Sequence, residues 1–215
     1  MFKERLAVSL NKLGLTANGA TFIGLVLAYA SGLLIYMGAF FLAGAALLLS
    51  GAMDLMDGAI ARASGTVSKG GGILDSSLDR YGDFFVFGGL LFYFANTARP
   101  LYVLLSASAL MGAYEISYVR ARAECALDGC RVGYWERGER LVYTALALLI
   151  GNPAVMLWVL GVGTHVTALS RLRHALRKAA GRDGPSGRVW RRTGAGYLAA
   201  TAALVAALFL FRVSP

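Results

Sequence analysis

Five aspartates lie within thirty residues of a chain whose flanking segments are long and apolar: Asp54, Asp57, Asp75, Asp79 and Asp83. An ionised carboxylate beside apolar segments costs enough free energy to require a partner or a function. Residues three or four apart share one face of a helix, so the first two aspartates form one acidic ridge and the last three form another. Two such ridges on neighbouring helices predict a site at which carboxylates act together.

Divalent metal binding is the chemistry that this site favours. Carboxylates held at one depth repel each other unless cations neutralise them. Neither ridge contains His or Cys, and hard ions such as Mg²⁺ and Mn²⁺ prefer oxygen ligands. Asp54, Asp57, Asp75 and Asp79 are enough to hold two ions roughly 4 Å apart, an arrangement that stabilises the attacking and leaving oxygens in phosphoryl chemistry. For Asp83, a ligand role and a packing role beside a basic neighbour are both open.

Small residues and one arginine accompany the acids. Gly58, Ala61 and Gly71 leave space for a bulky ligand, because none of them carries more than a methyl group. Arg62 offers a guanidinium fork that suits a phosphate group. Together these residues favour a diphosphate as the ligand.

The composition predicts a membrane protein. The chain has 215 residues, of which 57% are hydrophobic and 15% charged, and its mean hydropathy is +0.60. Several runs reach the roughly 20 apolar residues that cross a hydrocarbon core. We therefore expect an all-α, polytopic helix bundle. Its spans are expected at about residues 19–37, from 40 through the first acidic ridge, and at 75–94, 101–119, 141–150, 154–172 and 194–211.

The segments between and around the spans have their own signatures. Residues 1–15 place apolar side chains at helical spacing among charged ones, which favours a helix lying in the membrane interface. Thr16 or Asn18 is expected to cap the first span, and residues 64–72 are expected to form a glycine-rich loop. We divide the chain into a membrane domain at 1–175, a basic cytoplasmic linker at 176–193 and an additional C-terminal helix at 194–215.

The distribution of basic residues predicts the orientation. With the N-terminus in the cytoplasm, 19 of the 21 Lys and Arg residues lie on the cytoplasmic side, and only Arg99 and Arg212 lie outside. This positive-inside bias places the acidic ridges at the cytoplasmic face of the cell membrane. It also accounts for the net charge of +9 through contact with the lipid bilayer, without a nucleic-acid partner.

The acidic stretch resembles the signature of the CDP-alcohol phosphatidyltransferase family. That signature has Asp, two residues, Asp-Gly, two residues and Ala-Arg, then eight or nine residues, Gly, three residues, Asp, three residues and Asp. Every fixed position is met here, by Asp54, Asp57, Gly58, Ala61, Arg62, Gly71, Asp75 and Asp79. The resemblance covers about residues 1–175. It implies a six-span fold, a homodimer, and a cytoplasmic cavity that binds a CDP-linked lipid and two divalent ions, Mg²⁺ or Mn²⁺.

The resemblance also implies a role for each matched residue. Asp54, Asp57, Asp75 and Asp79 would be metal ligands, and Asp79 would also be the general base. The cytidine and diphosphate would be lined by Gly58, Ala61, Arg62 and Gly71. An acceptor hydroxyl would attack the lipid-side phosphorus and CMP would leave. The lipid would be CDP-diacylglycerol or CDP-archaeol.

The acceptor is predicted from arginines outside the signature. Arg120, Arg122, Arg140 and Arg171 resemble the positions by which the branch that makes phosphatidylinositol phosphate or archaetidylinositol phosphate binds the acceptor phosphate. Clustered guanidinium groups are what a dianionic phosphate needs in a half-buried cavity. The alternative is that these arginines anchor the spans, which is our interpretation of Arg137, Arg173 and Arg177.

The same residues leave other functions open. Glycerol phosphate, serine or another alcohol is the alternative acceptor for the same chemistry. The acids of a cation transporter or channel tend to lie near the bilayer midplane on broken helices, whereas these lie at one end of two spans. Inside the fourth span, Glu115 is expected to be hydrogen-bonded within the bundle.

Overall fold

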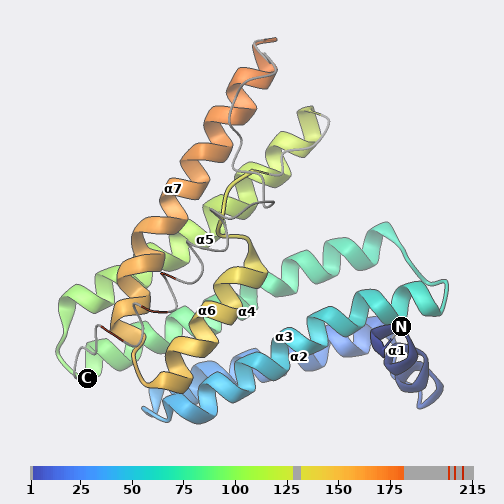
Figure 1. The fold of residues 1–215 in the computed structure, drawn as a ribbon, viewed down its shortest axis with the longest axis horizontal. Coiled ribbons are helices and arrows are strands. Elements are labelled where there is room, and N and C mark those ends of the chain that lie inside the picture. The colour runs from blue at the N-terminus through green and yellow to red at the C-terminus, as the bar shows by residue number, and fades with distance from the viewer. Residues whose placement is uncertain (1, 128–131, 182–202, 204–205, 207–209, 211–215) are drawn as a thin grey trace.

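The computed structural model describes residues 2–127, 132–181, 203, 206 and 210. Residues 2–127 and 132–181 form an all-helical bundle (Figure 1). The seven helices of these two ranges are α1 (Phe2–Lys12), α2 (Ala17–Tyr36), α3 (Phe40–Ala63), α4 (Lys69–Asn96), α5 (Pro100–Ala126), α6 (Arg137–Ile150) and α7 (Pro153–Ala179). The expected C-terminal helix at 194–215 lies outside the described residues. α7 continues past residue 176, so the beginning of the predicted linker is helical.

The expected membrane bundle is present, and its helices differ in length and polarity. Within the described ranges, α2, α3 and α7 are long and apolar enough to cross a membrane. α6 has 14 residues and is therefore about 21 Å long, which is shorter than a hydrocarbon core of roughly 30 Å. α6 ends at the turn at Gly151, on the side opposite to its charged first turn. Because α6 is short, that first turn lies deeper in the bundle than the ends of the longer helices.

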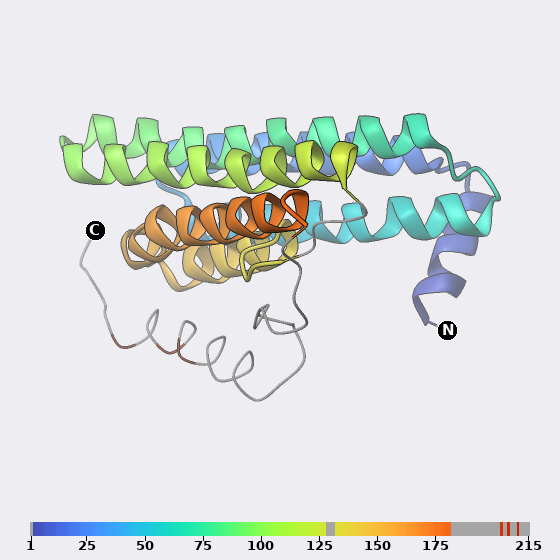
Figure 2. The same cartoon turned by 90° about the horizontal axis from the view of Figure 1, so that it is seen from above.

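Side-chain caps set the starts of α2 and α4. The Thr16 hydroxyl accepts the Gly19 N–H at 3.1 Å, which confirms the first of the two expected caps for α2. The predicted loop at 64–72 is too long, because the Ser68 hydroxyl accepts the Gly71 N–H at 3.0 Å and α4 starts at Lys69. The glycines at 70–72 therefore belong to a helical first turn. α1 leaves the bundle at an angle beside the α3–α4 turn (Figure 2).

Small residues bring the helices around the acids close together. α2 packs against both α3 and α4, and α3 packs against α6. A Cβ on Gly44 or Gly51 of α3 would lie within 3 Å of atoms in α6. The Ser50 hydroxyl donates to the Gly24 carbonyl of α2 at 2.8 Å. Close backbone approach and hydroxyl hydrogen bonds are how helices associate where lipid removes the hydrophobic drive.

The α2–α4 contact gives a test with a matched control. A Cβ on Gly89 would overlap the backbone of Gly32, whereas a Cβ on Gly88, one position earlier, would meet nothing within 4 Å. We expect Gly89→Ala to lower the free energy of unfolding by about 1–3 kcal/mol, the usual cost of overpacking. Gly88→Ala should leave it unchanged. Thermal unfolding in detergent measures both, and equal stability of the two variants would contradict this packing.

Candidate functional site

The two acidic ridges face a common region between α2, α3, α4 and α6. Asp54 and Asp57 lie near the end of α3, and Asp75, Asp79 and Asp83 lie in the first half of α4. The connection between these helices is short, so the two helices run in opposite directions and their acidic ends are adjacent (Figure 1). The structure thus brings together the acids that the sequence spacing predicted to act together.

Asp57 is the most enclosed of the five aspartates. It is 8% exposed, and its carboxylate accepts the Thr21 hydroxyl at 2.9 Å and the backbone N–H of Gly58. Thr21 is itself buried in α2. Thr21 is not among the site residues predicted from the sequence. The sequence signal for Thr21 is that it is a polar residue at helical spacing from the small residues Gly24 and Ala28.

Gly24 makes room for Asp54. A Cβ on Gly24 would lie 2.8 Å from one carboxylate oxygen of Asp54 and 3.4 Å from the Met53 Cβ. A larger residue on this face of α2 would therefore push the aspartate or the helix away. Gly24 was also missed by the sequence analysis, because nothing in the sequence states which helix faces α3.

Arg137 is the basic residue in closest contact with the acids. This first residue of α6 forms ion pairs with Asp54 and, at 3.1 Å, with Asp79. A Cβ on Gly82 would lie 3.5 Å from a terminal nitrogen of Arg137, so the side chain passes over a position without a side chain. The sequence favours the interpretation of Arg137 as a membrane anchor. That interpretation is wrong, because its guanidinium joins the two acidic ridges inside the bundle.

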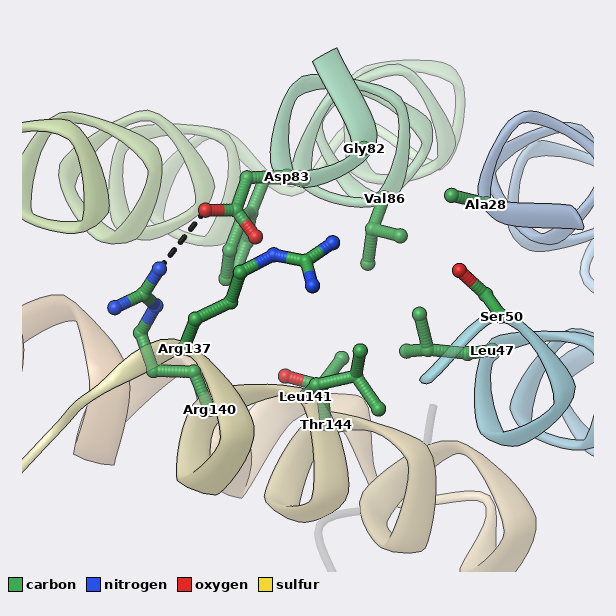
Figure 3. A pocket seen from close by; sticks show the side chains of 11 residues that line it. Ala28, Leu47, Ser50, Gly82, Asp83, Val86, Arg137, Arg140, Leu141 and Thr144 are labelled. Carbon is green, nitrogen blue, oxygen red and sulfur yellow. Dashed lines mark hydrogen bonds and ion pairs between the residues drawn. The ribbon is translucent and has the colours of Figure 1, made fainter. Parts of the chain in front are cut away.

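A second ion pair lies deeper in the same region. Arg140 is 2% exposed and donates to Asp83 at 2.8 Å and to the Trp135 carbonyl at 3.1 Å. Figure 3 shows Asp83 and Arg140 joined at one side of a pocket into which the Arg137 guanidinium projects. Of the two roles considered for Asp83, the packing acid paired with a basic neighbour is the one in this structure.

Arg80 connects the acids to α5. It lies 3.6 Å from the neighbouring Asp79 and donates to the Ser117 hydroxyl. The Tyr114 hydroxyl donates to the Arg80 carbonyl at 3.0 Å. Arg80 was not identified by the sequence analysis, although its place directly after Asp79 was a usable signal.

Two small cavities meet at Arg137. One opens beside the acids and is lined by Thr21, Gly24, Leu25, Ala28, Asp54, Leu78, Asp79, Gly82 and Arg137. The other has a polar side at the arginines and an apolar floor (Figure 3). Its lining is Ala28, Leu47, Ser50, Gly82, Asp83, Val86, Phe87, Arg137, Arg140, Leu141 and Thr144. The Arg137 side chain therefore separates the first cavity, here called the acidic cavity, from the second, here called the basic cavity.

The donor set fits a hard divalent ion. Among residues 2–127 and 132–181, no three acidic, His or Cys side chains lie close enough to hold a metal ion as they stand. Asp54 and Asp79 instead share one guanidinium, which shows that these two carboxylates can hold a cation between them. Asp75 makes no hydrogen bond or ion pair within the described ranges. With Arg137 displaced, the four aspartates would offer oxygen ligands from two facing helices.

The residues predicted for the nucleotide lie where the ridges meet. Gly58, Ala61 and Arg62 occupy the last turns of α3, and Gly71 occupies the first turn of α4. The Arg62 side chain is exposed, and a Cβ on Gly58 would lie 3.4 Å from one of its nitrogens. The Arg62 guanidinium lies over Gly58, which has no side chain, and is therefore accessible to an anionic ligand.

The four predicted acceptor arginines occupy different environments. Arg120 pairs with Glu124 at 2.9 Å near the end of α5, and Arg122 is exposed two residues later. Arg171 is 2% exposed and donates to the carbonyls of Val132 at 2.6 Å and Ile116 at 2.8 Å. Arg140 is the member of this set that lines the cavity of Figure 3.

Comparison with known sequences identifies similar proteins. The family described as CDP-alcohol phosphatidyltransferase matches residues 14–170. The chain is 34% identical over 176 residues to the archaetidylinositol phosphate synthase of Pyrococcus horikoshii, covering 81% of this chain and 91% of that protein. It is also 34% identical over 178 residues to the phosphatidylinositol phosphate synthase of Mycobacterium marinum, covering 78% of this chain and 76% of that protein.

Comparison with solved structures gives the same picture. The phosphatidylinositol phosphate synthase of Mycobacterium tuberculosis in complex with manganese and citrate superposes with a TM-score of 0.74 at 30% identity, over 81% of this chain and 88% of that chain. The same enzyme with CDP-DAG bound superposes with a TM-score of 0.73 at 31% identity, over 80% of this chain and 92% of that chain.

The Thr21–Asp57 hydrogen bond gives the second test. Thr21→Val keeps the side-chain shape but removes a buried donor to a carboxylate, so we expect a loss of about 1–3 kcal/mol in unfolding free energy. Thr144→Val is the matched control, because the buried Thr144 hydroxyl contacts the Met156 sulfur at 3.8 Å. Denaturation in detergent measures both. A Thr21→Val variant no less stable than Thr144→Val would contradict the contact.

Proposed function

The chain belongs to the CDP-alcohol phosphatidyltransferase family, and from this premise we propose that it transfers a phosphatidyl or archaetidyl group from a CDP-linked lipid to inositol phosphate. It is a multi-pass membrane enzyme. The observation that carries the proposal is the convergence of all eight signature residues at the adjoining ends of α3 and α4, beside a basic cavity. Glycerol phosphate or another alcohol is the alternative acceptor.

Asp79 is the proposed base. Its side chain is 15% exposed and lies in the wall of the acidic cavity, at the border with the cavity that contains Arg140. A base must lie within reach of the hydroxyl it activates. Asp79 would take the hydroxyl proton as the acceptor oxygen forms a bond to the lipid-side phosphorus. The bond between that phosphorus and the CMP oxygen would break, and CMP would carry away the negative charge.

Four aspartates are the proposed metal ligands. Asp54, Asp57, Asp75 and Asp79 would hold two divalent ions, Mg²⁺ or Mn²⁺, which when bound neutralise the diphosphate and stabilise the leaving CMP. Support comes from the all-oxygen donor set and from a structural relative described with manganese. The Thr21 hydroxyl fixes the orientation of the Asp57 carboxylate within this set.

The arginines are the proposed acceptor site. Arg140 is held by Asp83 and by the Trp135 carbonyl, so its guanidinium is oriented before any ligand enters. Arg120, Arg122 and Arg171 complete the proposed set. Arg171 also donates to the carbonyl of Val132, in the segment before α6, and to that of Ile116 in α5.

Orientation, lipid and assembly belong to the same proposal. The excess of Lys and Arg beside the acidic end favours a cytoplasmic active site and N-terminus. The lipid would be CDP-diacylglycerol or CDP-archaeol, in line with relatives from bacteria and an archaeon. We propose a homodimer, which light scattering of the protein in detergent would test.

The direct experiment supplies purified protein with CDP-diacylglycerol or CDP-archaeol and Mg²⁺ or Mn²⁺, and measures CMP release. Inositol phosphate, glycerol phosphate, inositol and serine are offered in turn. We expect release with inositol phosphate. Release with glycerol phosphate alone would overturn the acceptor, and no release with any acceptor would overturn the function.

The role of Asp79 is tested by Asp79→Asn. We expect CMP release to fall by at least about a thousandfold, because one change removes both a base and a metal ligand. CDP-lipid binding should remain detectable. Glu115→Gln is the control, since Glu115 is a half-buried carboxylate of α5 outside the site, and it should retain turnover. Comparable activity of the two variants would contradict the assignment.

Arg140 gives a separate test of the acceptor site. Loss of a charge-assisted hydrogen bond of about 1.5–3 kcal/mol corresponds to a rise of roughly tenfold or more in the KM for inositol phosphate. We expect this rise for Arg140→Gln with little change in the KM for the CDP-lipid. Arg177→Gln, an exposed change near the end of α7, should alter neither. A rise only in the KM for the CDP-lipid would show that Arg140 binds the CDP-lipid and not the acceptor.

A further inference from the structure

Arg137 has an unusual position for a helix residue. It opens α6, and Arg140 follows in the same turn region, although the N-terminal end of a helix carries a partial positive charge that disfavours cations. Carboxylates from other helices offset this cost, because Arg137 pairs with Asp54 on α3 and Asp79 on α4. Its placement therefore depends on the acids keeping their negative charge available to it.

The contacts of Arg137 are those of a counter-ion rather than of a structural clamp. Its two terminal nitrogens contact the two aspartates, while its buried Nε has no hydrogen-bond partner in the described part of the chain. Arg171 offers the contrast, since its Nε and one terminal nitrogen donate to backbone carbonyls of two other segments. Backbone carbonyls are fixed acceptors, whereas the carboxylates that hold Arg137 are also the proposed metal ligands.

Divalent ions and Arg137 compete for the same oxygens. Two ions bound by the aspartates would place several positive charges beside the guanidinium and beside the positive end of α6. Like charges at such distances repel strongly where little water is present. Arg137 would then leave the acids, and its side chain already borders the cavity of Figure 3, with Gly82 offering no side chain in the way.

We propose that Arg137 is a metal-displaced counter-ion that holds Asp54 and Asp79 together before the metals bind and afterwards binds an anionic group of the substrates. In the second position it stands beside Arg140, so the cavity gains a second guanidinium for a phosphate once the metals are in place. Metal binding thereby prepares the anion site. This inference rests on the proposed function, because it takes the four aspartates as metal ligands.

The test is the affinity for Mn²⁺ itself, measured by isothermal titration of purified protein without substrates. Arg137→Gln removes the competitor, so we expect Mn²⁺ to bind about tenfold tighter or more. Arg137→Lys keeps a positive charge beside the acids, and because the competition is between charges it should stay within about threefold of the unsubstituted protein. Arg140→Gln also removes one positive charge from α6, but that charge pairs with Asp83 and not with the proposed metal ligands. It should therefore change the Mn²⁺ affinity by less than about threefold.

A second variant keeps the test decisive if Arg137→Gln does not fold. Arg137→Ala is purified with guanidinium chloride at low millimolar concentration, and Mn²⁺ is titrated with and without that ion. The cation should weaken Mn²⁺ binding in this variant and not in the unsubstituted protein. Urea, which has a similar shape without the charge, should have no effect.

The outcomes separate this inference from the function. Unchanged or weaker Mn²⁺ binding by Arg137→Gln, in a protein that binds Mn²⁺ and releases CMP, would overturn the counter-ion role alone. An equal rise in Mn²⁺ affinity in Arg137→Gln and Arg140→Gln would also overturn it. The loss of any positive charge near the site would then have the same effect. Absence of Mn²⁺ binding by an unsubstituted protein that releases CMP would overturn the inference alone, and absence of both would overturn the proposed function with it.

Discussion

Carboxylates from two neighbouring helices repel each other, and the repulsion grows where little water reaches them. In this bundle Asp54 and Asp79 share the guanidinium of Arg137, which comes from a third helix. That ion-pair bridge joins α3, α4 and α6. The same need for a cation supports the proposal that these aspartates bind divalent metals and, through them, a diphosphate.

The rest of the fold brings these charges to one depth. Glycines of α3 let α6 approach closely, and Gly24 of α2 leaves space for the Asp54 carboxylate. The short α6 keeps its basic first turn inside the thickness of the bundle rather than at its end. The neighbouring Asp83–Arg140 pair places a fixed guanidinium in the basic cavity, next to the acidic cavity.

Much of this arrangement is predictable from sequence, and the reason is local. Apolar runs locate the helices, and the spacing of the acids places them on helix faces whatever the packing. Arg137, Thr21 and Gly24 were missed or misassigned because their roles depend on which helices touch, across up to 83 positions of sequence. The start of α4 was missed for a smaller reason, since the Ser68 cap outweighs the helix-breaking tendency of three glycines.

The central claim is that aspartates of α3 and α4 form one site for two divalent ions. Electron paramagnetic resonance of the protein with two equivalents of Mn²⁺ tests it most directly, because ions roughly 4 Å apart couple magnetically. We predict the spectrum of a coupled pair, lost in Asp57→Asn and in Asp75→Asn. Isolated Mn²⁺ signals at every metal concentration, with and without CDP-lipid, would contradict the claim.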